Sequence, residues 1–342
     1  MASTVTVYVD PDAAGGGTGV DWTNAYTDLQ TAENAKDGDI TAATGSDEIY
    51  VFECRSSGNT AETDKITVLG WTTAAGNYVE FKATSTDKAI ITGYSATIWR
   101  VEETDDWCFD IAENFVRITD MQLKSTYSAD DLKGCINIGG VDAANDIRIS
   151  GCRITNAGAG SYYGIKLNDA DGIMKVWNTI VCDVTLQGIF VQNCATVNVY
   201  NCITYNCGTD AMKKQGGTTM NAYNCVSFAN TDDFDSLDVV DYCATDDGDG
   251  TNDVAGNEAD GTWSTDFVGA GTGDFTMLTG SPLKDAGVND PGSGLYSTGM
   301  DGVAYVTDAW CLGVYEFVEA AGGVAPTGAL SGPLGGPLAG AF

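Results

Sequence analysis

Val197-Asn-Val-Tyr-Asn-Cys-Ile-Thr204 returns 23 residues later as Met220-Asn-Ala-Tyr-Asn-Cys-Val-Ser227. Three related octapeptides come earlier, so the five starts are spaced by 31, 27, 23 and 23 residues, beginning at Val116, Ile147 and Met174. A period of 23 residues is typical of one coil of a β-solenoid, in which every coil is a supersecondary unit stacked on the last. The repeat therefore predicts a fold that grows in one dimension.

Each octapeptide has the pattern of a strand that ends in a corner. Apolar residues alternate at its start, as at Val197 and Val199, which places them on one face of a strand. Asp, Gly or Asn follows at the fifth position, where a turn is tolerated, and a small or soft residue at the sixth. A second strand signal lies between repeats, as at 188–191. Each coil is thus expected to hold at least two strands.

Stacking would bring equivalent side chains of neighbouring coils about 4.8 Å apart, so like residues should form ladders. The repeat predicts three such ladders. One is an Asn ladder at a corner, a second is an aromatic stack beside it, and a third is a pair of interior thiols. Their members are Asn178, Asn201 and Asn224; Trp177, Tyr200 and Tyr223; and Cys202 and Cys225.

The N-terminal region is expected to close one end of the solenoid. Residues 5–9 alternate like a strand, and residues 22–36 have helical composition, with Leu29 and Ala32 spaced for one face. A helix there would cover the first coil, since an open end leaves backbone groups unpaired. The strands expected in the first coils are Glu48–Cys54, Ile66–Leu69, Tyr78–Ala83 and Ala89–Thr92.

The composition narrows the class of partner. A net charge of −32 with no His argues against nucleic acid and against an anionic membrane surface, because both need a basic face. Solubility and protection of exposed surface are favoured as the reason for the charge over a specific basic partner. The eleven Cys include no CxxC pair, which predicts buried free thiols made in a reducing cytoplasm. The N-terminus lacks signal-peptide features, and a recloned secreted protein is the alternative.

The opening segment VYVDPDAAGGGTGVDWTNAYTDLQTA (7–32), the coils, and the later segments 280–287 and 311–317 carry a resemblance. Over about residues 5–318 the chain resembles the right-handed parallel β-helix proteins of the pectate-lyase-like superfamily. The resemblance implies an all-β solenoid with a short N-terminal capping helix and an extended C-terminal tail. It implies no single activity, since the superfamily includes lyases, hydrolases, epimerases, adhesins, and phage tailspike and capsid-decorating proteins.

Four regions are expected: an N-terminal cap at 1–45, coils at 46–245, a loop-rich β region closing the solenoid at 246–318, and a tail at 319–342. The tail is uncharged and rich in Gly, Pro and Leu, and its prolines argue against a helix. Composition alone favours disorder. We nevertheless interpret the tail as an extended peptide that docks into a partner. The docking residues would be Leu330, Pro333, Leu334, Pro337, Leu338 and Phe342.

No catalytic residue is assigned. A hydrolase of this fold needs two or three neighbouring carboxylates, and a lyase typically uses Arg or Lys as its base, as the resemblance implies. A solvated turn is favoured for every candidate, and His is missing as a general acid or base. Convergence of Asp169, Asp171, Lys213, Arg117 and Arg148 on one concave face would reverse this interpretation. The remaining candidates are Lys214 and the group Asp232, Asp233 and Asp235.

One acidic loop partly matches an EF-hand calcium loop. Its ligands would be Asp247, Asp249, Asp253 and Glu258. Asn252 stands where that loop needs Gly, and no flanking helices are evident, so an acidic surface loop is the default. No metal or other cofactor is therefore expected, with calcium as the minor alternative.

These features together favour a non-enzymatic structural protein of a phage virion, assembled in the bacterial cytoplasm. It would decorate the capsid as a cement protein, or form a spike, with its tail bound to the major capsid protein or another virion subunit. Homo-oligomers and a carbohydrate partner stay open. The alternatives are a polysaccharide lyase or hydrolase, including a depolymerase, and a secreted carbohydrate-binding adhesin.

Overall fold

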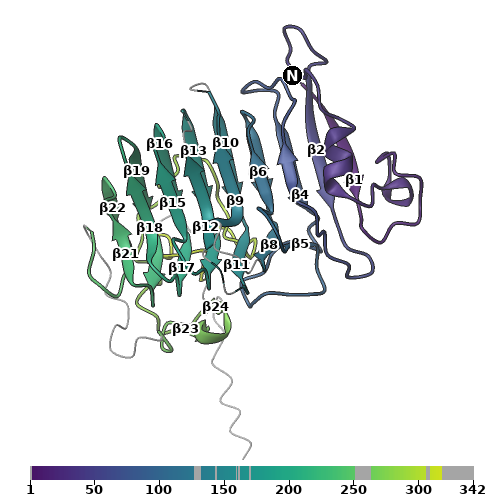
Figure 1. Cartoon of the computed structure of the whole chain (residues 1–342). Coiled ribbons are helices and arrows are strands. Elements are labelled where there is room, and N and C mark those ends of the chain that lie inside the picture. The colour runs from purple at the N-terminus through teal and green to yellow at the C-terminus, as the bar shows by residue number, and fades with distance from the viewer. Residues whose placement is uncertain are drawn as a thin grey trace, which may run out of the picture.

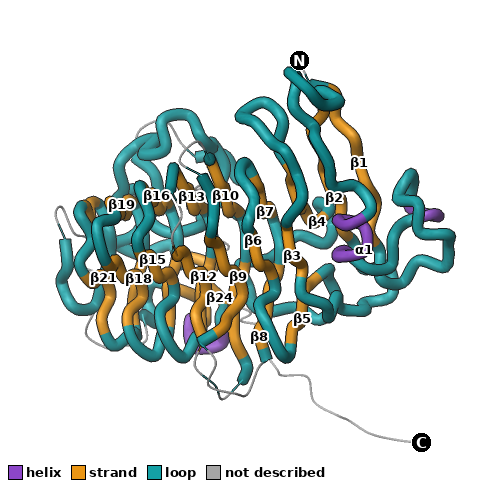
Figure 2. The backbone as a smooth tube through the Cα atoms, turned by 45° about the horizontal axis from the view of Figure 1, so that its top comes forward, coloured by secondary structure: helices purple, strands orange, loops and turns teal. Residues whose placement is uncertain are grey.

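A computed structural model describes residues 2–126, 132–142, 145–158, 160, 162–168, 171–250, 263–305 and 309–317. These residues form a right-handed parallel β-helix whose coils stack side by side along one axis (Figures 1 and 2). Three long sheets run along the solenoid, with nine, seven and six strands. None of the helices among the described residues is long and apolar enough to cross a membrane.

The β1–β22 sheet contains the first half of each octapeptide. Its strands are β1 (Ser3–Val9), β2 (Glu48–Cys54), β4 (Val79–Ala83), β7 (Val116–Thr119), β10 (Asp146–Ser150), β13 (Ile173–Trp177), β16 (Thr196–Tyr200), β19 (Thr219–Tyr223) and β22 (Val239–Asp241).

The second half of each octapeptide lies in the β5–β20 sheet. Its strands are β5 (Arg100–Glu103), β8 (Gln122–Ser125), β11 (Arg153–Asn156), β14 (Ile180–Cys182), β17 (Ile203–Tyr205) and β20 (Val226–Phe228). The strand signals between repeats form the β3–β21 sheet. Its strands are β3 (Ile66–Val68), β6 (Phe109–Ile111), β9 (Lys133–Gly139), β12 (Tyr162–Asn168), β15 (Ile189–Gln192), β18 (Asp210–Gln215) and β21 (Asp232–Asp235).

The predicted ladders form in part, since Trp177 pairs in register with Tyr200 but its ring stacks on Tyr296 of the C-terminal region, with centroids 6.0 Å apart. Val197 and Val199 are fully buried inside the solenoid, and Tyr200 pairs in register with Tyr223, their rings stacked with centroids 5.8 Å apart. The two interior thiols at 202 and 225 are also fully buried. The Asn corners adopt the left-handed backbone that Asn tolerates, with φ of 49°, 46° and 55° at 178, 201 and 224. All eleven cysteines are buried and none is joined in a disulfide, as the sequence predicts.

The segment Ala89–Thr92 is not a strand, so that prediction is wrong. Its backbone bonds to residues of distant segments and not to a neighbouring strand. The carbonyl of Ile91 accepts from the backbone N–H of Phe275, at 3.1 Å. The guanidinium of Arg153 reaches the same carbonyl, at 3.5 Å. The strand of this coil begins instead at Arg100.

The N-terminal end is closed by a helical cap. After the short turn η1 (Trp22–Asn24), α1 (Leu29–Asn34) packs beside β3, the edge strand of its sheet. The side-chain amide of Gln30 bonds both backbone groups of Thr67 on that edge, so it takes the place of a neighbouring strand. Buried Glu33 accepts from the indole N–H of Trp71 at 2.9 Å and from the backbone N–H of Leu69.

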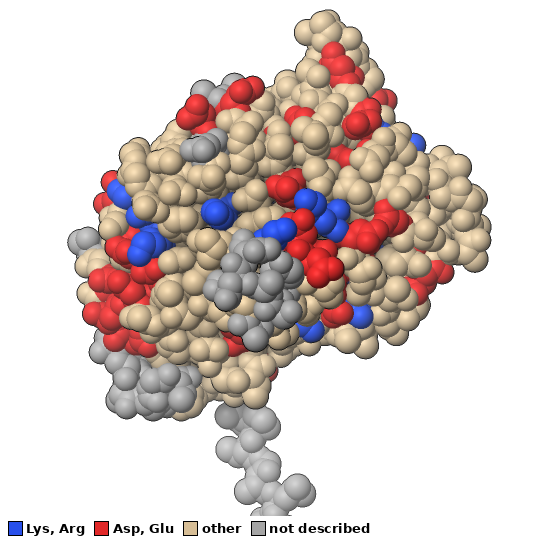
Figure 3. Space-filling model, in the orientation of Figure 1, with Lys and Arg blue, Asp and Glu red and all other residues tan. Residues whose placement is uncertain are grey.

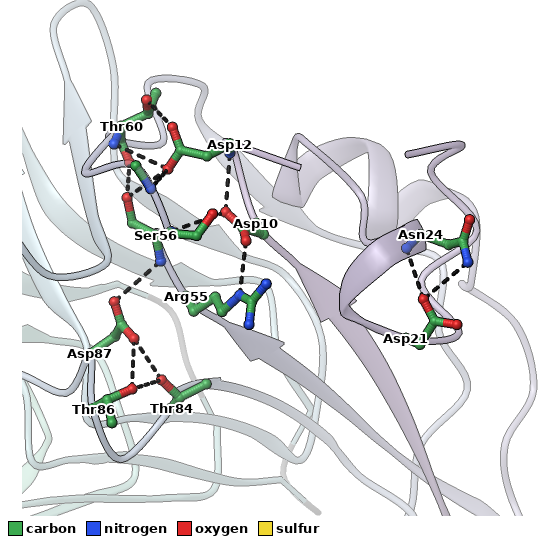
Figure 4. A network of polar contacts seen from close by, with 12 residues as sticks. Asp10, Asp12, Asp21, Asn24, Arg55, Ser56, Thr60, Thr84, Thr86 and Asp87 are labelled. Atoms are coloured by element: carbon green, nitrogen blue, oxygen red, sulfur yellow. Dashed lines mark hydrogen bonds and ion pairs between the residues drawn. The ribbon is translucent and has the colours of Figure 1, made fainter. Parts of the chain in front are cut away.

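Figure 4 shows further carboxylates that hold the loop after β2. Asp10 is fully buried and accepts from Nε of Arg55 at 2.8 Å. Asp12 accepts from the backbone N–H of Gly58 at 2.6 Å. Asp87 accepts from the backbone N–H of Ser56 at 3.2 Å. Some of the many acidic side chains therefore accept hydrogen bonds that hold loops in place. This role adds to the solubility that the composition indicates.

The C-terminal region returns along the solenoid. Its elements are β23 (Phe267–Gly269), η3 (Ala270–Thr272) and β24 (Asp274–Met277). β23 and β24 form an antiparallel hairpin. Beyond the hairpin, the chain runs along the Asn corners. Asn224 donates to the carbonyl of Val288, Asn201 to that of Gly313, and Asn178 to that of Thr298, at 2.8, 3.0 and 2.7 Å. The ladder thus fastens the C-terminal region along the side of the solenoid.

Candidate functional site

The outer face of the β3–β21 sheet carries a polar row. Asp110, Asn137, Lys166, Phe190, Lys213 and Asp235 occupy equivalent outward positions on successive strands. The row is internally bonded, since Asn137 donates to Asp110 at 2.8 Å. Figure 3 shows basic residues as a band across the face turned to the viewer, with acidic residues beside them. Basic side chains thus have acidic neighbours along this band, and acidic patches extend beyond it.

Phe190 of this row belongs to a group of three aromatic rings. Trp107 stacks on Tyr163 with centroids 6.5 Å apart, and Tyr163 stacks on Phe190 at 5.3 Å. The ammonium group of Lys166 lies 5.1 Å from the centre of the Tyr163 ring. The rings are only 7–8% exposed, so they pack against neighbours and do not form an open platform for a ligand.

The clearest charged cluster lies at the β21 end of this face. One carboxylate oxygen from each of Asp210, Asp232 and Asp235 lies within 4.8 Å of the others. Lys213 links two of them, with Nζ 2.6 Å from Asp235 and 3.3 Å from Asp210. Adjacent strands β18 and β21 supply the cluster, so only stacking of the coils assembles it.

The pKa values of Asp232 and Asp235 are shifted in opposite directions. The hydrogen bond from Lys213 lowers the pKa of Asp235, and the same bond raises the pKa of Lys213. Burial raises the pKa of Asp232, and the neighbouring carboxylates add to the effect. Lys213 consequently stays protonated near neutral pH and is a poor base for a lyase. A carboxylate pair with split pKa values is the arrangement a glycoside hydrolase would need.

Two residues of the candidate calcium loop, Asp247 and Asp249, cap the end of the solenoid at β21. Asp247 accepts from the backbone N–H of Asp233 at 2.9 Å, and Asp249 accepts from that of Phe234 at 3.2 Å. β21 is the edge strand of its sheet at this end. These carboxylates therefore accept hydrogen bonds from backbone N–H groups that have no neighbouring strand to bond. The carboxylates of Asp247 and Asp249 also lie beside Asp232. The other two candidate ligands, Asp253 and Glu258, lie outside the described residues.

Asp233 is the buried centre of this end. Its carboxylate accepts from Ser227 Oγ at 2.7 Å, from Asn230 Nδ2 at 2.8 Å and from the backbone N–H of Asp246 at 3.0 Å. Burial raises its pKa to about 7. The sequence grouped Asp233 with Asp232 and Asp235, but Asp233 is 1% exposed and its hydrogen bonds to Ser227 and Asn230 hold it in a separate, buried environment.

The five residues whose convergence would indicate an enzyme do not share one sheet. Arg117 and Arg148 pair in register on the β1–β22 sheet, whereas Lys213 lies on the β3–β21 sheet. Arg117 packs 3.2 Å from the centre of the Tyr78 ring, and Arg148 forms an ion pair with Asp146. Both guanidinium groups are thus engaged within their own sheet.

The remaining candidates are placed separately. Asp171 lies on an exposed loop between β12 and β13, and Asp169 lies outside the described residues. Lys214 forms an ion pair with Asp238 at 2.9 Å. The proposed docking residues of the tail also lie outside the described residues, namely Leu330, Pro333, Leu334, Pro337, Leu338 and Phe342.

Comparison with known proteins adds little to this geometry. No protein-family model matches the chain, and no curated protein matches it in sequence. Among solved structures, the crystal structure of pectate lyase Pel9A aligns with 92% of this chain and 97% of that chain. The aligned residues are 11% identical and the TM-score is 0.33. A similarity this distant supports no argument about activity or substrate.

Proposed function

We propose that the chain is a structural protein of a phage virion, a capsid-decorating (cement) or spike protein held by its C-terminal tail. Its partner would be the major capsid protein or another virion subunit. The role is mechanical: a stack of hydrogen-bonded coils adds stability or reach to the shell. No catalytic step is required of the described residues.

One observation carries the proposal: the chain that leads to the tail is fastened to the solenoid. Asn201 donates to the carbonyls of both Cys311 and Gly313, at 3.0 Å each. The last described residue, Phe317, donates its N–H to the sulfur of Cys311 at 3.3 Å. Lys284 lies 5.2 Å from the centre of the Phe317 ring. A load applied to residues 319–342 would therefore pass into the rigid coils.

Deletion of residues 319–342 tests this role. Full-length and truncated chains would be expressed in a host that produces the particles, and the fraction that sediments with purified particles measured. We expect the full-length chain to stay bound through a high-salt wash, since an uncharged tail makes contacts that salt does not screen. The truncated chain should keep its melting temperature but stay in the supernatant. Equal incorporation of the two chains would reject the proposal.

The alternative, a polysaccharide hydrolase, is favoured by one observation, the split pKa values within the Asp210–Asp232–Asp235 cluster. The test is release of reducing ends from neutral and acidic capsular polysaccharides. A hydrolase should lose nearly all activity in the Asp235→Asn variant, while Asp171→Asn, on a separate exposed loop, should keep it. Absence of activity in the wild-type chain on the whole panel would dismiss this alternative.

A further inference from the structure

The outer edge of β1 is open over the first half of the strand. β1 ends the nine-stranded sheet, so β2 pairs with only one side of it (Figures 1 and 2). The N–H of Ser3 points to the β2 side, where it donates to the carbonyl of Asp47 at 3.0 Å. Backbone groups alternate in direction along a strand, so those of Thr4 and Thr6 point away from the sheet.

The second half of the same edge is covered. The N–H of Tyr8 donates to the carbonyl of Gly19 at 3.0 Å, and the carbonyl of Tyr8 accepts from the N–H of Tyr26 at 2.9 Å. Thr4 and Thr6 have no equivalent partner, since no described residue bonds their outward backbone groups. Thr4 is also exposed and Thr6 is half-buried. The open edge therefore spans Ser3 to Val7.

The other edges of the three long sheets are covered or short. Glu62 pairs with β5 and Ala244 pairs with β20, each through an isolated bridge. Gln30 covers β3, and the carboxylates of Asp247 and Asp249 cover β21. β22, at the opposite edge of the nine-stranded sheet, has only three residues. Natural proteins cover or shorten such edges because an open edge pairs with other chains, so the first half of β1 stands out as a pairing surface.

The composition of β1 points to a second copy of the chain as the partner. The strand reads STVTVYV, which is rich in β-branched residues and has no proline and no charge. Each copy carries a net charge of −32, so an uncharged edge is where two copies repel one another least. A second copy also supplies a matching set of backbone groups. In an antiparallel arrangement with Val5 on the two-fold axis, Thr4 of each copy lies opposite Thr6 of the other.

We propose that two copies pair antiparallel through β1 and form a symmetric dimer. The N–H of each Thr4 donates to the carbonyl of Thr6 in the other copy, and the N–H of that Thr6 donates to the carbonyl of Thr4. The pairing joins the two nine-stranded sheets into one. Each copy has one such edge, so assembly stops at two copies. The inference does not depend on the proposed virion role.

The test is sedimentation velocity on the full-length chain between about 5 and 500 µM. Hydrogen exchange of residues 2–9 at the two ends of this range locates the interface. Thr4→Pro removes one outward N–H and no hydrogen bond to a described residue, since an edge strand accepts Pro where its N–H faces outward. Thr4→Val keeps the backbone groups and is the matched control. A double variant, Thr4→Asp with Thr6→Asp, keeps those groups but sets carboxylates opposite one another. Melting temperatures confirm that each variant folds.

We expect a dissociation constant of about 10–500 µM, because a few backbone bonds with little apolar contact make a weak interface. Raising NaCl from about 20 to 500 mM should strengthen the dimer, since salt screens the repulsion between two acidic copies. Exchange of residues 2–9 should slow at the higher protein concentration. Thr4→Pro and the double Asp variant should weaken dimerisation at least about tenfold, whereas Thr4→Val should leave it unchanged.

The inference is overturned if the chain stays monomeric up to about 500 µM, or if it assembles beyond two copies. Dimers that form equally well in Thr4→Pro and in the double Asp variant would also overturn it, because they would place the interface elsewhere. Dissociation of the dimer by salt would do the same, since it would indicate ion pairs in place of backbone bonds. If Thr4→Pro fails to fold, the double Asp variant decides between these outcomes.

Discussion

The hydroxyl of Tyr296 donates to Oδ1 of Asn201 at 2.7 Å, across 95 residues of chain. Asn201 was recognisable as a corner of the repeat, and Tyr296 belongs to no repeat at all. The corner side chain is fully buried and donates as well to the carbonyls of Cys311 and Gly313. A ladder residue of the solenoid is thus also the main attachment point of the C-terminal region.

Replacing Asn201 should loosen that attachment. Asn201→Ala removes four side-chain hydrogen bonds and forces a Cβ residue other than Asn into φ of 46°, so we expect a loss of about 3 kcal/mol in the free energy of unfolding. Asn201→Gly should lose roughly 1 kcal/mol less, since Gly accepts that backbone. Urea unfolding measures both. Asn198→Ala, on the outer face of the same coil, is the control, and an equal effect there would contradict the assignment.

Gln30 should protect the N-terminal edge from self-association. Its amide bonds both backbone groups of Thr67, so Gln30→Ala would uncover the edge of β3. We expect about 1–2 kcal/mol of destabilisation and a concentration-dependent rise in mass by light scattering. Gln192→Ala removes an exposed amide bond to Gln215 and is the control. An unchanged mass and stability in Gln30→Ala would count against the capping role.

Arg153 and Gly273 should be energetically coupled. Nη2 of Arg153 donates to the carbonyl of Gly273 at 3.0 Å, and a Cβ on Gly273 would lie 2.4 Å from that nitrogen. Gly273 also has φ of 78°, so Gly273→Ala should cost about 2–4 kcal/mol. Arg153→Ala relieves the clash, and the double variant should lose less stability than the two single losses added. Simple additivity in urea unfolding would refute the coupling.

The N-terminal cap should weaken as pH rises. Burial raises the pKa of Glu33 from 4.5 to about 7, opposed by the Trp71 hydrogen bond, while the charge of Asp37 adds to the rise. The folded state therefore binds the proton of Glu33 more tightly than the unfolded state does. Protonation of Glu33 contributes its full stabilisation of the folded state below about pH 4.5. That contribution is lost as pH rises through about 7.

The Glu33→Gln variant isolates this effect. It should reduce the fall in melting temperature between about pH 5 and pH 8, because the amide cannot ionise. Glu53→Gln, on the outer face of β2, is the control and should leave the fall unchanged. The prediction fails if the wild type and Glu33→Gln lose the same number of degrees over this range.

Calcium should have little effect on stability. Asp247 and Asp249 already accept backbone N–H groups of β21, and their chelation would compete with that role. After EDTA treatment, millimolar CaCl₂ should shift the melting temperature by less than about 1 °C, no more than MgCl₂ does. A larger shift specific to calcium, abolished in Asp249→Asn, would show that the acidic loop is a metal site.

Local patterns could be predicted because they depend on near neighbours in sequence. Alternation in residues 197–204 identifies a buried strand face, and Asn at a fixed position identifies a left-handed corner. The β5–β20 and β3–β21 sheets follow once the coil length is known. The prediction for segment 89–92 failed because the backbone carbonyl of Ile91 bonds to Arg153 and to Phe275 of the C-terminal hairpin, which no nearby sequence pattern indicates.

The candidate sites were harder to predict for the same reason. Asp232 and Asp235 were visible as an acidic run, but Asp210 and Lys213 join them only through pairing of β18 with β21. The stack of Tyr305 on Trp310 could not be foreseen either, since Tyr305 and its neighbour Tyr296 bond to corner residues about a hundred positions earlier.

The amino-acid sequence by itself determined the coil, its period, its interior ladders and its free thiols, because each depends on periodic burial within one repeat unit. Only the tertiary structure decided which groups the corner side chains bond. Asn178, Asn201 and Asn224 point their amides at the returning C-terminal region, and carboxylates cap both ends of the stack. Such contacts join chain segments far apart in sequence, and their geometry exists only after the coils have stacked.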